Sequence, residues 1–366
     1  MSFFENTRKP VGLGGKLMVA MMNLGHSPVA RWGLRFLRLA PNAKVLDCGC
    51  GGGANIKRLL KKCPHGDRHD GHSGCAGGNY DSFYSLRKKP MKCKIEKNTV
   101  QETLILPLYS RKLCTELYPN LYRDETAVRL LDQIDYDFSE AAKNSCSLMQ
   151  RFGALEVAMR QGDLAFEVQD YLKGHPNAAV VNLGCGLDNT GRTCDNGRCK
   201  IYNLDFPDVI ALRQQLLPAG DREQNIPCDL KDTVWFSKIN ASGGAVFFAS
   251  GVFYYFLTQQ VRELVRGMAD AFPGSVLVFD AANRTAVKMI AKTWLKTAKI
   301  KDVGAYFAVS DAAKEIGTWG RRLQVTSRGY MLGYNDLKDP SVSGFFRFLA
   351  RVGDNGMKMQ IVKIRF

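Results

Sequence analysis

Two short glycine-containing segments have residue types and spacing that could do chemistry. Residues 44–53 read KVLDCGCGGG and residues 180–188 read VVNLGCGLD. Each begins with an aliphatic run suited to a buried parallel strand and then places glycines two residues apart. Such glycines let the chain turn tightly while its backbone approaches a ligand. Both segments therefore indicate a nucleotide-binding turn, although ordinary strand-to-helix turns also carry a single Gly-x-Gly.

Acidic residues follow the second segment at the positions where a nucleotide site would need them. Lys200–Leu204 reads as a short strand ending in Asp205, about 20 residues beyond the loop, where a carboxylate can accept hydrogen bonds from ribose hydroxyls. Ile226–Leu230 reads as the end of a third strand with Asp229 at its tip. The alternative for both acids is a capping role in the turn that follows each strand.

The elements needed to position these residues alternate along residues 175–366. The alternation of strands and helices predicts an α/β fold with one open sheet, and ligands of such sheets bind at the carboxyl ends of the strands. The predicted helices are Asp208–Leu217 and Gln259–Phe272, and the further predicted strands are Ala245–Ala249, Ser275–Ala281, Gln324–Leu332 and Met357–Phe366.

The first glycine segment is not followed by such an alternation. Ala54–Lys62 has helical spacing, but residues 64–92 show no apolar periodicity and are expected to form a linker. One strand with a few helices cannot form a doubly wound sheet. We therefore expect residues 1–63 to be the truncated front of a domain, with an incomplete binding site.

Composition and charge exclude several classes of protein. An apolar fraction of 45% excludes a disordered chain, and no run reaches the roughly 18 apolar residues of a membrane span. The net charge is +16, of which residues 1–92 contribute +11, from 16 Lys/Arg against 5 Asp/Glu. A basic segment can bind nucleic acid, but a solvated helix face explains it as well, so a nucleic-acid partner is not expected.

The cysteines indicate free thiols in a reducing cytoplasm. The 11 cysteines are scattered over a long chain, and the N-terminus makes a poor export signal. Cys194 and Cys199 flank a predicted Asn-Gly turn and are expected to be two thiols rather than a redox pair. One cluster is metal-capable, but its spacing fits no standard zinc finger, so no metal is predicted. Its members are Cys63, His65, His69, His72 and Cys75.

Four ordered motifs resemble those of one enzyme family: PNAAVVNLGCGLD, YNLDFPDVIALR, CDLKDTVWF and SGVFYYF. They are similar to the class I S-adenosylmethionine-dependent methyltransferases, and in particular to the leucine carboxyl methyltransferase family and its tetracenomycin-type polyketide branch. The resemblance covers residues 97–366. It implies a Rossmann-like catalytic domain over 175–366 and a helical cap over 93–174. Residues 1–63 separately resemble the truncated start of another class I methyltransferase.

The resemblance also implies a role for individual residues in binding S-adenosyl-L-methionine. The loop backbone would line the methionine part, Asp205 would hold the ribose, Asp229 and Leu230 would frame the adenine, and Arg160 would pair with the cofactor carboxylate. The full implied set is Arg160, Gly184, Cys185, Gly186, Asp205, Asp229, Leu230 and Ser250. The chain departs from the family pattern at Asn182 and Ser250, where acids are usual, and at Ala165, where aspartate is usual.

The resemblance implies O-methylation of a small, polyketide-like acceptor at a carboxylate or a phenol. Tyr254 and Tyr255 are acceptor-side candidates, although aromatic runs are core packing at least as often. A carboxylate acceptor needs no general base, and no residue stands out as one. The alternatives are methylation of a protein C-terminal carboxylate and a non-catalytic cofactor-sensing or RNA-binding module. A dehydrogenase is disfavoured because the second loop lacks a third glycine.

Overall fold

The computed structural model contains two compact units, Met1–Met91 and Lys92–Phe366. In the second unit it describes residues 92–95, 100–138, 147–290 and 306–366. In the first it describes residues 45–47, 54–62 and 68–70, with scattered positions between 21 and 36. The finer division into a fragment, a linker, a cap and a catalytic domain remains our proposal.

The first unit contains a short strand-helix-strand succession. Strand β1 (Val45–Asp47) precedes helix α3 (Ala54–Lys62), and strand β2 (Arg68–Asp70) pairs with β1 in parallel. Strand β2 falls within residues 64–92, where the sequence predicts a linker, because three polar residues give no apolar periodicity. The glycine turn after β1 and the metal-capable residues other than His69 lie outside the described residues.

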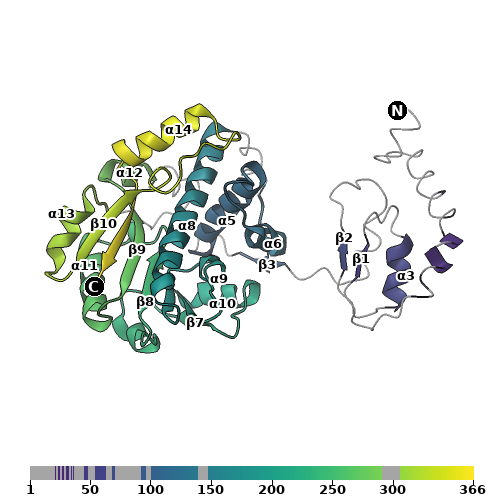
Figure 1. Cartoon of the computed structure of the whole chain (residues 1–366), viewed down its shortest axis with the longest axis horizontal. Coiled ribbons are helices and arrows are strands. Elements are labelled where there is room, and N and C mark those ends of the chain that lie inside the picture. The colour runs from purple at the N-terminus through teal and green to yellow at the C-terminus, as the bar shows by residue number, and fades with distance from the viewer. Residues whose placement is uncertain are drawn as a thin grey trace. The chain divides into compact units, whose positions relative to one another are not determined.

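Seven strands form one sheet within the described part of the second unit, in the order β10-β11-β9-β8-β5-β6-β7 (Figure 1). The strand pairs from β9 to β7 are parallel, and β11 is antiparallel to both neighbours. This confirms the predicted α/β fold. The bounds are β5 Ala179–Leu183, β6 Lys200–Asp205, β7 Glu223–Pro227, β8 Ala245–Ala249, β9 Val276–Ala281, β10 Gln324–Gly329 and β11 Gln360–Arg365.

Strand β7 differs from its prediction. The sequence predicts Ile226–Leu230, but the observed strand begins at Glu223 and ends at Pro227. The reason is its position at the edge of the sheet, where Glu223, Gln224 and Asn225 are only partly buried or exposed and give no apolar run. Asp229 therefore lies in the turn after the strand rather than at its last residue.

Helix α8 (Leu148–Gly174) contacts strands β8, β9 and β11, and it also packs against helix α5. Strands β3 (Cys93–Lys94) and β4 (Ile134–Asp135) form a short parallel pair. The further α-helices among the described residues of the unit are α5 Val100–Leu117, α6 Glu125–Gln133, α9 Thr190–Thr193, α10 Pro207–Leu216, α11 Thr258–Ala271, α12 Arg284–Ile290, α13 Ala312–Ile316 and α14 Gly344–Arg351. Within the described residues, no helix has the length and apolar composition of a membrane span.

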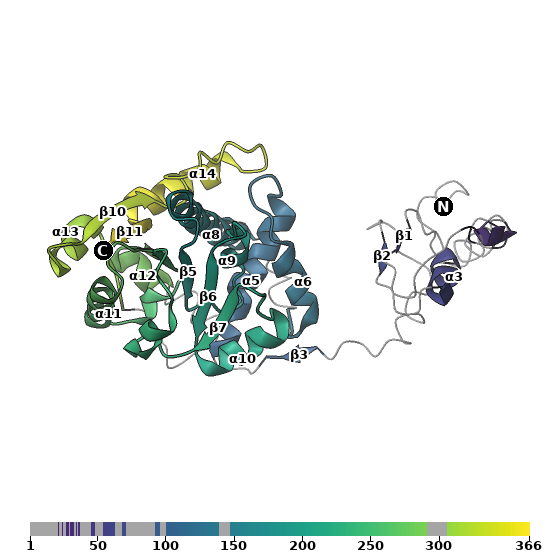
Figure 2. The same ribbon diagram turned by 60° about the horizontal axis from the view of Figure 1, so that its bottom comes forward.

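The central strands of the sheet are buried on both faces, which explains their continuous apolar runs. On one face Val180, Val246 and Val278 pack with residues of α8. On the other face Val181 and Phe247 pack with residues of α11. Burying each such side chain contributes about 1.5–3 kcal/mol. This core holds the carboxyl ends of β5, β6, β8 and β9 in fixed positions, with β5, β6 and β7 side by side in Figure 2.

Candidate active site

The loop after β5 requires glycine at two positions. Gly184 has a φ of +66° and Gly186 a φ of +45°, in the left-handed region that favours glycine. A Cβ on Gly184 would lie 2.6 Å from a Val252 methyl carbon, and one on Gly186 would lie 2.9 Å from a Leu104 methyl carbon. The backbone of this loop therefore packs closely against the segment after β8 and against helix α5.

Asp205, at the end of β6, holds this loop through its carboxylate. One oxygen accepts a hydrogen bond from the Gly186 backbone N–H at 2.8 Å, and the other accepts one from the Phe206 N–H at 2.8 Å. Burial raises the pKa of the Asp205 carboxyl. Because a carboxylate can accept about four hydrogen bonds, these two contacts leave capacity for a ligand hydroxyl. The ribose role stays a prediction.

Asp188 is a central residue that the sequence analysis missed. Its two oxygens accept hydrogen bonds from the Gln161 amide at 2.9 Å and the Asn182 amide at 2.8 Å. Arg111 lies 3.6 Å away and donates to the Leu187 carbonyl at 3.1 Å. Asn182 is at a position where the resembled family usually has an acid. Its amide donates a hydrogen bond to the carboxylate of Asp188, which belongs to the loop itself.

The ends of β8 and β9 meet helix α8 through an ion pair. The Arg160 guanidinium lies 3.1 Å from an oxygen of Asp280, whose other oxygen accepts the Gly251 N–H at 2.6 Å. The Asp280 side chain is 1% exposed. Arg160 Nε is buried and has no hydrogen-bond partner among the described residues. Arg160 thus reaches the ends of the strands, and it has donors left for an anionic ligand.

Glu156 lies one helical turn before Arg160 and was also missed. Its carboxylate accepts a hydrogen bond from the Tyr330 hydroxyl at 2.8 Å. Burial raises the pKa of Glu156 and raises the pKa of Tyr254. The partly buried carboxylate of Glu156 is a candidate general base, a role for which the sequence alone offers no residue that stands out. Glu156 and Tyr330 are separated by 174 residues, so no local pattern could have paired them.

The remaining predicted residues lie in different surroundings. Tyr254 is buried in the core beside α8, whereas Tyr255 is 42% exposed. The Ser250 hydroxyl donates to the Gln161 side chain at 3.3 Å. Asp229 accepts the Lys231 N–H at 3.0 Å and is not a helix N-cap, a role that Asp232 fills for the next turn. Leu230 is buried.

The cysteines in the described residues are free thiols, as expected. Burial raises the pKa of Cys194 to about 12 and also raises the pKa of Cys199, so neither is an activated thiol. Cys185 in the loop is likewise buried with a raised pKa, which leaves its backbone as the part that can meet a ligand. No cluster of metal-binding side chains occurs in the described ranges.

These contacts bring most of the predicted residues to one edge of the sheet. Leu183 of β5 pairs with Leu204 of β6, and the Cys228 N–H donates to the Asp205 carbonyl, so the ends of β5, β6 and β7 are adjacent. At this edge, where ligands of open α/β sheets bind, the loop with Gly184 and Gly186 lies next to the Asp205 carboxylate. We refer to this loop and carboxylate together as the cradle.

Comparisons with known proteins identify related sequences. Residues 110–269 match the family model described as leucine carboxyl methyltransferase. The tetracenomycin polyketide synthesis O-methyltransferase TcmP of Streptomyces glaucescens is 30% identical over 183 residues, which span 50% of this chain and 66% of that protein.

Solved structures give weaker likenesses. A putative methyltransferase from Thermobifida fusca has 16% identity and a TM-score of 0.45, over 70% of this chain and 93% of that one. A DUF574 family protein from Streptomyces avermitilis has 12% identity and a TM-score of 0.47, over 70% and 96%. Because both scores are below 0.5, the assignment rests on the sequence matches. The sequence matches relate residues 110–269 to the leucine carboxyl methyltransferase family.

Proposed function

We propose that the second unit is an S-adenosylmethionine-dependent O-methyltransferase that acts on a small, polyketide-like acceptor. The observation that carries the proposal is the cradle at the ends of β5 and β6. There, the loop with its two left-handed glycines is held to Asp205 by one hydrogen bond, from the Gly186 N–H, at 2.8 Å. The family match and the similarity to TcmP support methyl transfer as the reaction.

The residues present fit this cofactor. Glycine at positions 184 and 186 allows the left-handed turn that brings the loop beside Asp205, and the open acceptor capacity of Asp205 suits ribose hydroxyls. The spare donors of Arg160 suit a carboxylate. We also propose that the Cys185 backbone lines the methionine part of the cofactor. Asp229 and Leu230 would contact the adenine, and Ser250 would lie near the sulfonium.

Bound there, the cofactor supplies a methyl group that is already activated as a sulfonium. The protein then has to align the acceptor oxygen in line with that group and exclude water, which can contribute several kcal/mol to lowering the barrier. Because the cofactor is proposed to lie at the ends of β5 and β6, we place the acceptor at the neighbouring ends of β8 and β9, beside Asp280 and Tyr254. For a hydroxyl acceptor, we propose that Glu156 takes the proton. A carboxylate acceptor would not need this step.

A protein C-terminal carboxylate is the second candidate acceptor, favoured by the description of the family model. We also propose a cytoplasmic location and no nucleic-acid partner.

A calorimetric titration of S-adenosylhomocysteine tests the cofactor proposal. Asp205→Asn places an amide where two backbone N–H groups need acceptors, so we expect at least tenfold weaker binding. Asp221→Asn, an exposed position, is the matched control and should bind as the parent protein does. Absence of binding by the parent protein would refute the proposal.

Methyl transfer from S-adenosylmethionine tritiated on its methyl group then identifies the acceptor class. The three probes are 1-naphthol, 2-naphthoic acid and a peptide with a free C-terminal leucine. Label on either naphthalene supports a small-molecule acceptor. Label only on the peptide would replace that acceptor with the protein carboxylate and leave the cofactor proposal intact.

A further inference from the structure

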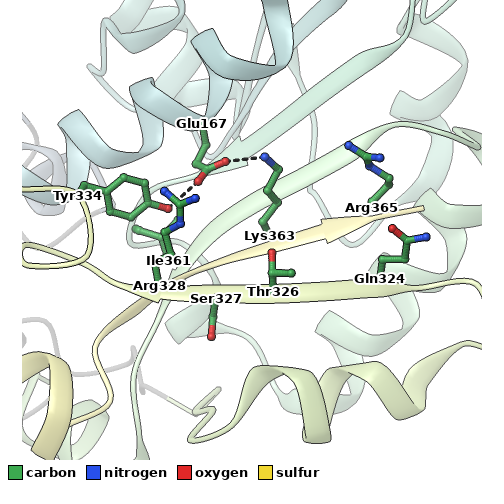
Figure 3. A pocket seen from close by; sticks show the side chains of 9 residues that line it. All are labelled: Glu167, Gln324, Thr326, Ser327, Arg328, Tyr334, Ile361, Lys363 and Arg365. Carbon is green, nitrogen blue, oxygen red and sulfur yellow. Dashed lines mark hydrogen bonds and ion pairs between the residues drawn. The ribbon is translucent and has the colours of Figure 1, made fainter. Parts of the chain in front are cut away.

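A groove runs along the face of strands β10 and β11, on the side that helix α8 covers in part (Figure 3). It has a volume of about 500 Å³, within the range of small-molecule pockets. Nine residues line it, and none is among those proposed to bind the cofactor or the acceptor. The groove therefore needs an explanation of its own.

The register of the two strands gathers basic side chains in this groove. Paired residues of antiparallel strands project from the same face, and Gln324 pairs with Arg365, Thr326 with Lys363, and Arg328 with Ile361. Figure 3 shows Arg328 at one end of the groove, Arg365 at the other and Lys363 between them. Neither β10 nor β11 contains an acidic residue.

The carboxylate that lines the groove is already engaged. One oxygen of Glu167 lies 2.7 Å from Lys363 Nζ, and the other accepts the Tyr334 hydroxyl hydrogen bond at 2.8 Å. The Glu167 side chain is 5% exposed. Lys363 also lies 3.9 Å from Asp170 of α8. The charge of Lys363 is therefore balanced by the protein, and Glu167 has little exposed surface with which to repel an anion.

The two arginines at the ends are not balanced in this way. Within the part of the chain that the structure describes, no ion pair shorter than 4.0 Å joins either Arg328 or Arg365 to a carboxylate. Arg328 is held over the Tyr334 ring, with 5.3 Å from its guanidinium carbon to the ring centre. Gln324 and Thr326 add amide and hydroxyl donors between the two ends.

The spacing of the arginines indicates the shape of a ligand. Arg328 lies opposite Ile361, which is four residues from Arg365 along β11. At about 3.3 Å per residue, the two positions are about 13 Å apart. Guanidinium groups bind carboxylates and phosphates through paired hydrogen bonds. We propose that this groove binds an elongated small molecule with an anionic group, carboxylate or phosphate, at each end.

The test uses the full chain and three probes in phosphate-free buffer. Sodium suberate carries a carboxylate at both ends of an eight-carbon chain, sodium octanoate carries one on a chain of the same length, and sodium tripolyphosphate represents phosphates. We expect saturable calorimetric binding of suberate or tripolyphosphate, and at least tenfold weaker binding of octanoate. Whichever of suberate and tripolyphosphate binds identifies the chemistry of the end groups.

Single substitutions connect such binding to the groove. Arg328→Gln and Arg365→Gln remove exposed side chains, so folding should be preserved, and each should weaken the better probe at least tenfold. Arg351→Gln, an equal charge change at an exposed position of α14, should have no effect. Saturating S-adenosylhomocysteine should not compete with the probe.

Three results would overturn the proposal. These are the absence of saturable binding of both suberate and tripolyphosphate, equal affinity for octanoate and suberate, and an equal loss of affinity in Arg351→Gln. The last result would show that surface charge in general, rather than the groove, attracts the anion.

Discussion

Replacing Gly184 by alanine should destabilise the protein through two separable effects. A residue with a Cβ at a φ of +66° costs about 1–2 kcal/mol. The new Cβ would also lie 2.6 Å from a Val252 methyl carbon, and crowding of this kind costs about 1–3 kcal/mol. The expected loss in the free energy of unfolding is therefore about 2–5 kcal/mol.

Gly197 provides a matched control. Its φ is +81°, but a Cβ there would meet no atom within 4 Å. Gly197→Ala should therefore cost only the backbone part, about 1–2 kcal/mol. The loss of chain entropy in the unfolded state is common to both variants and cancels in the comparison. Val252→Ala introduced into Gly184→Ala should recover most of the crowding part.

Urea unfolding followed by circular dichroism measures these differences in the free energy of unfolding. Calorimetric titration measures the affinity of each variant for S-adenosylhomocysteine. We expect Gly184→Ala to weaken ligand binding and Gly197→Ala to leave it unchanged. Equal destabilisation of the two variants, or no recovery on adding Val252→Ala, would refute the close packing of the loop against the segment after β8.

Three further predictions concern charge and thiols. Burial raises the pKa of Asp163 to about 8 from 3.8, so the folded state holds a proton that the unfolded state releases. The free energy of unfolding should therefore fall by at least about 1 kcal/mol as the pH rises from 5 to 8. Urea unfolding of Asp163→Asn should show a shallower fall, and a slope as steep as the parent's would contradict this. Arg160→Ala leaves the buried Asp280 carboxylate unpaired and should cost about 3–5 kcal/mol, whereas adding Asp280→Asn should restore part of it in the same assay. Cys194 and Cys199 should react with a thiol reagent only on unfolding, and rapid labelling of the folded protein would contradict their burial.

The sequence predicted those parts of the fold that depend on local patterns. The run of Ala245–Ala249 forms β8 without any shift, because a central strand is apolar at every position. The edge strand β7 was misplaced because Glu223, Gln224 and Asn225 face solvent in part. The three-residue strand β2 was missed for the similar reason that it has no apolar pattern.

The candidate site could be predicted only where it depends on consecutive residues. The glycine loop and Asp205 have a recognisable spacing along the chain. Asp280 pairs with Arg160 across 120 residues, and neither its strand nor its neighbours mark it as a site residue. Asp188 was overlooked because its importance comes from the donors gathered around it, which only the folded chain brings together.

The central claim is that the second unit holds the cofactor site. Its most direct test is calorimetric titration of S-adenosylhomocysteine into the intact chain, with Gly184→Val and Gly49→Val variants beside it. We predict one site that is lost only in Gly184→Val. Two sites, or one site lost only in Gly49→Val, would contradict the claim by placing a working pocket in the first unit.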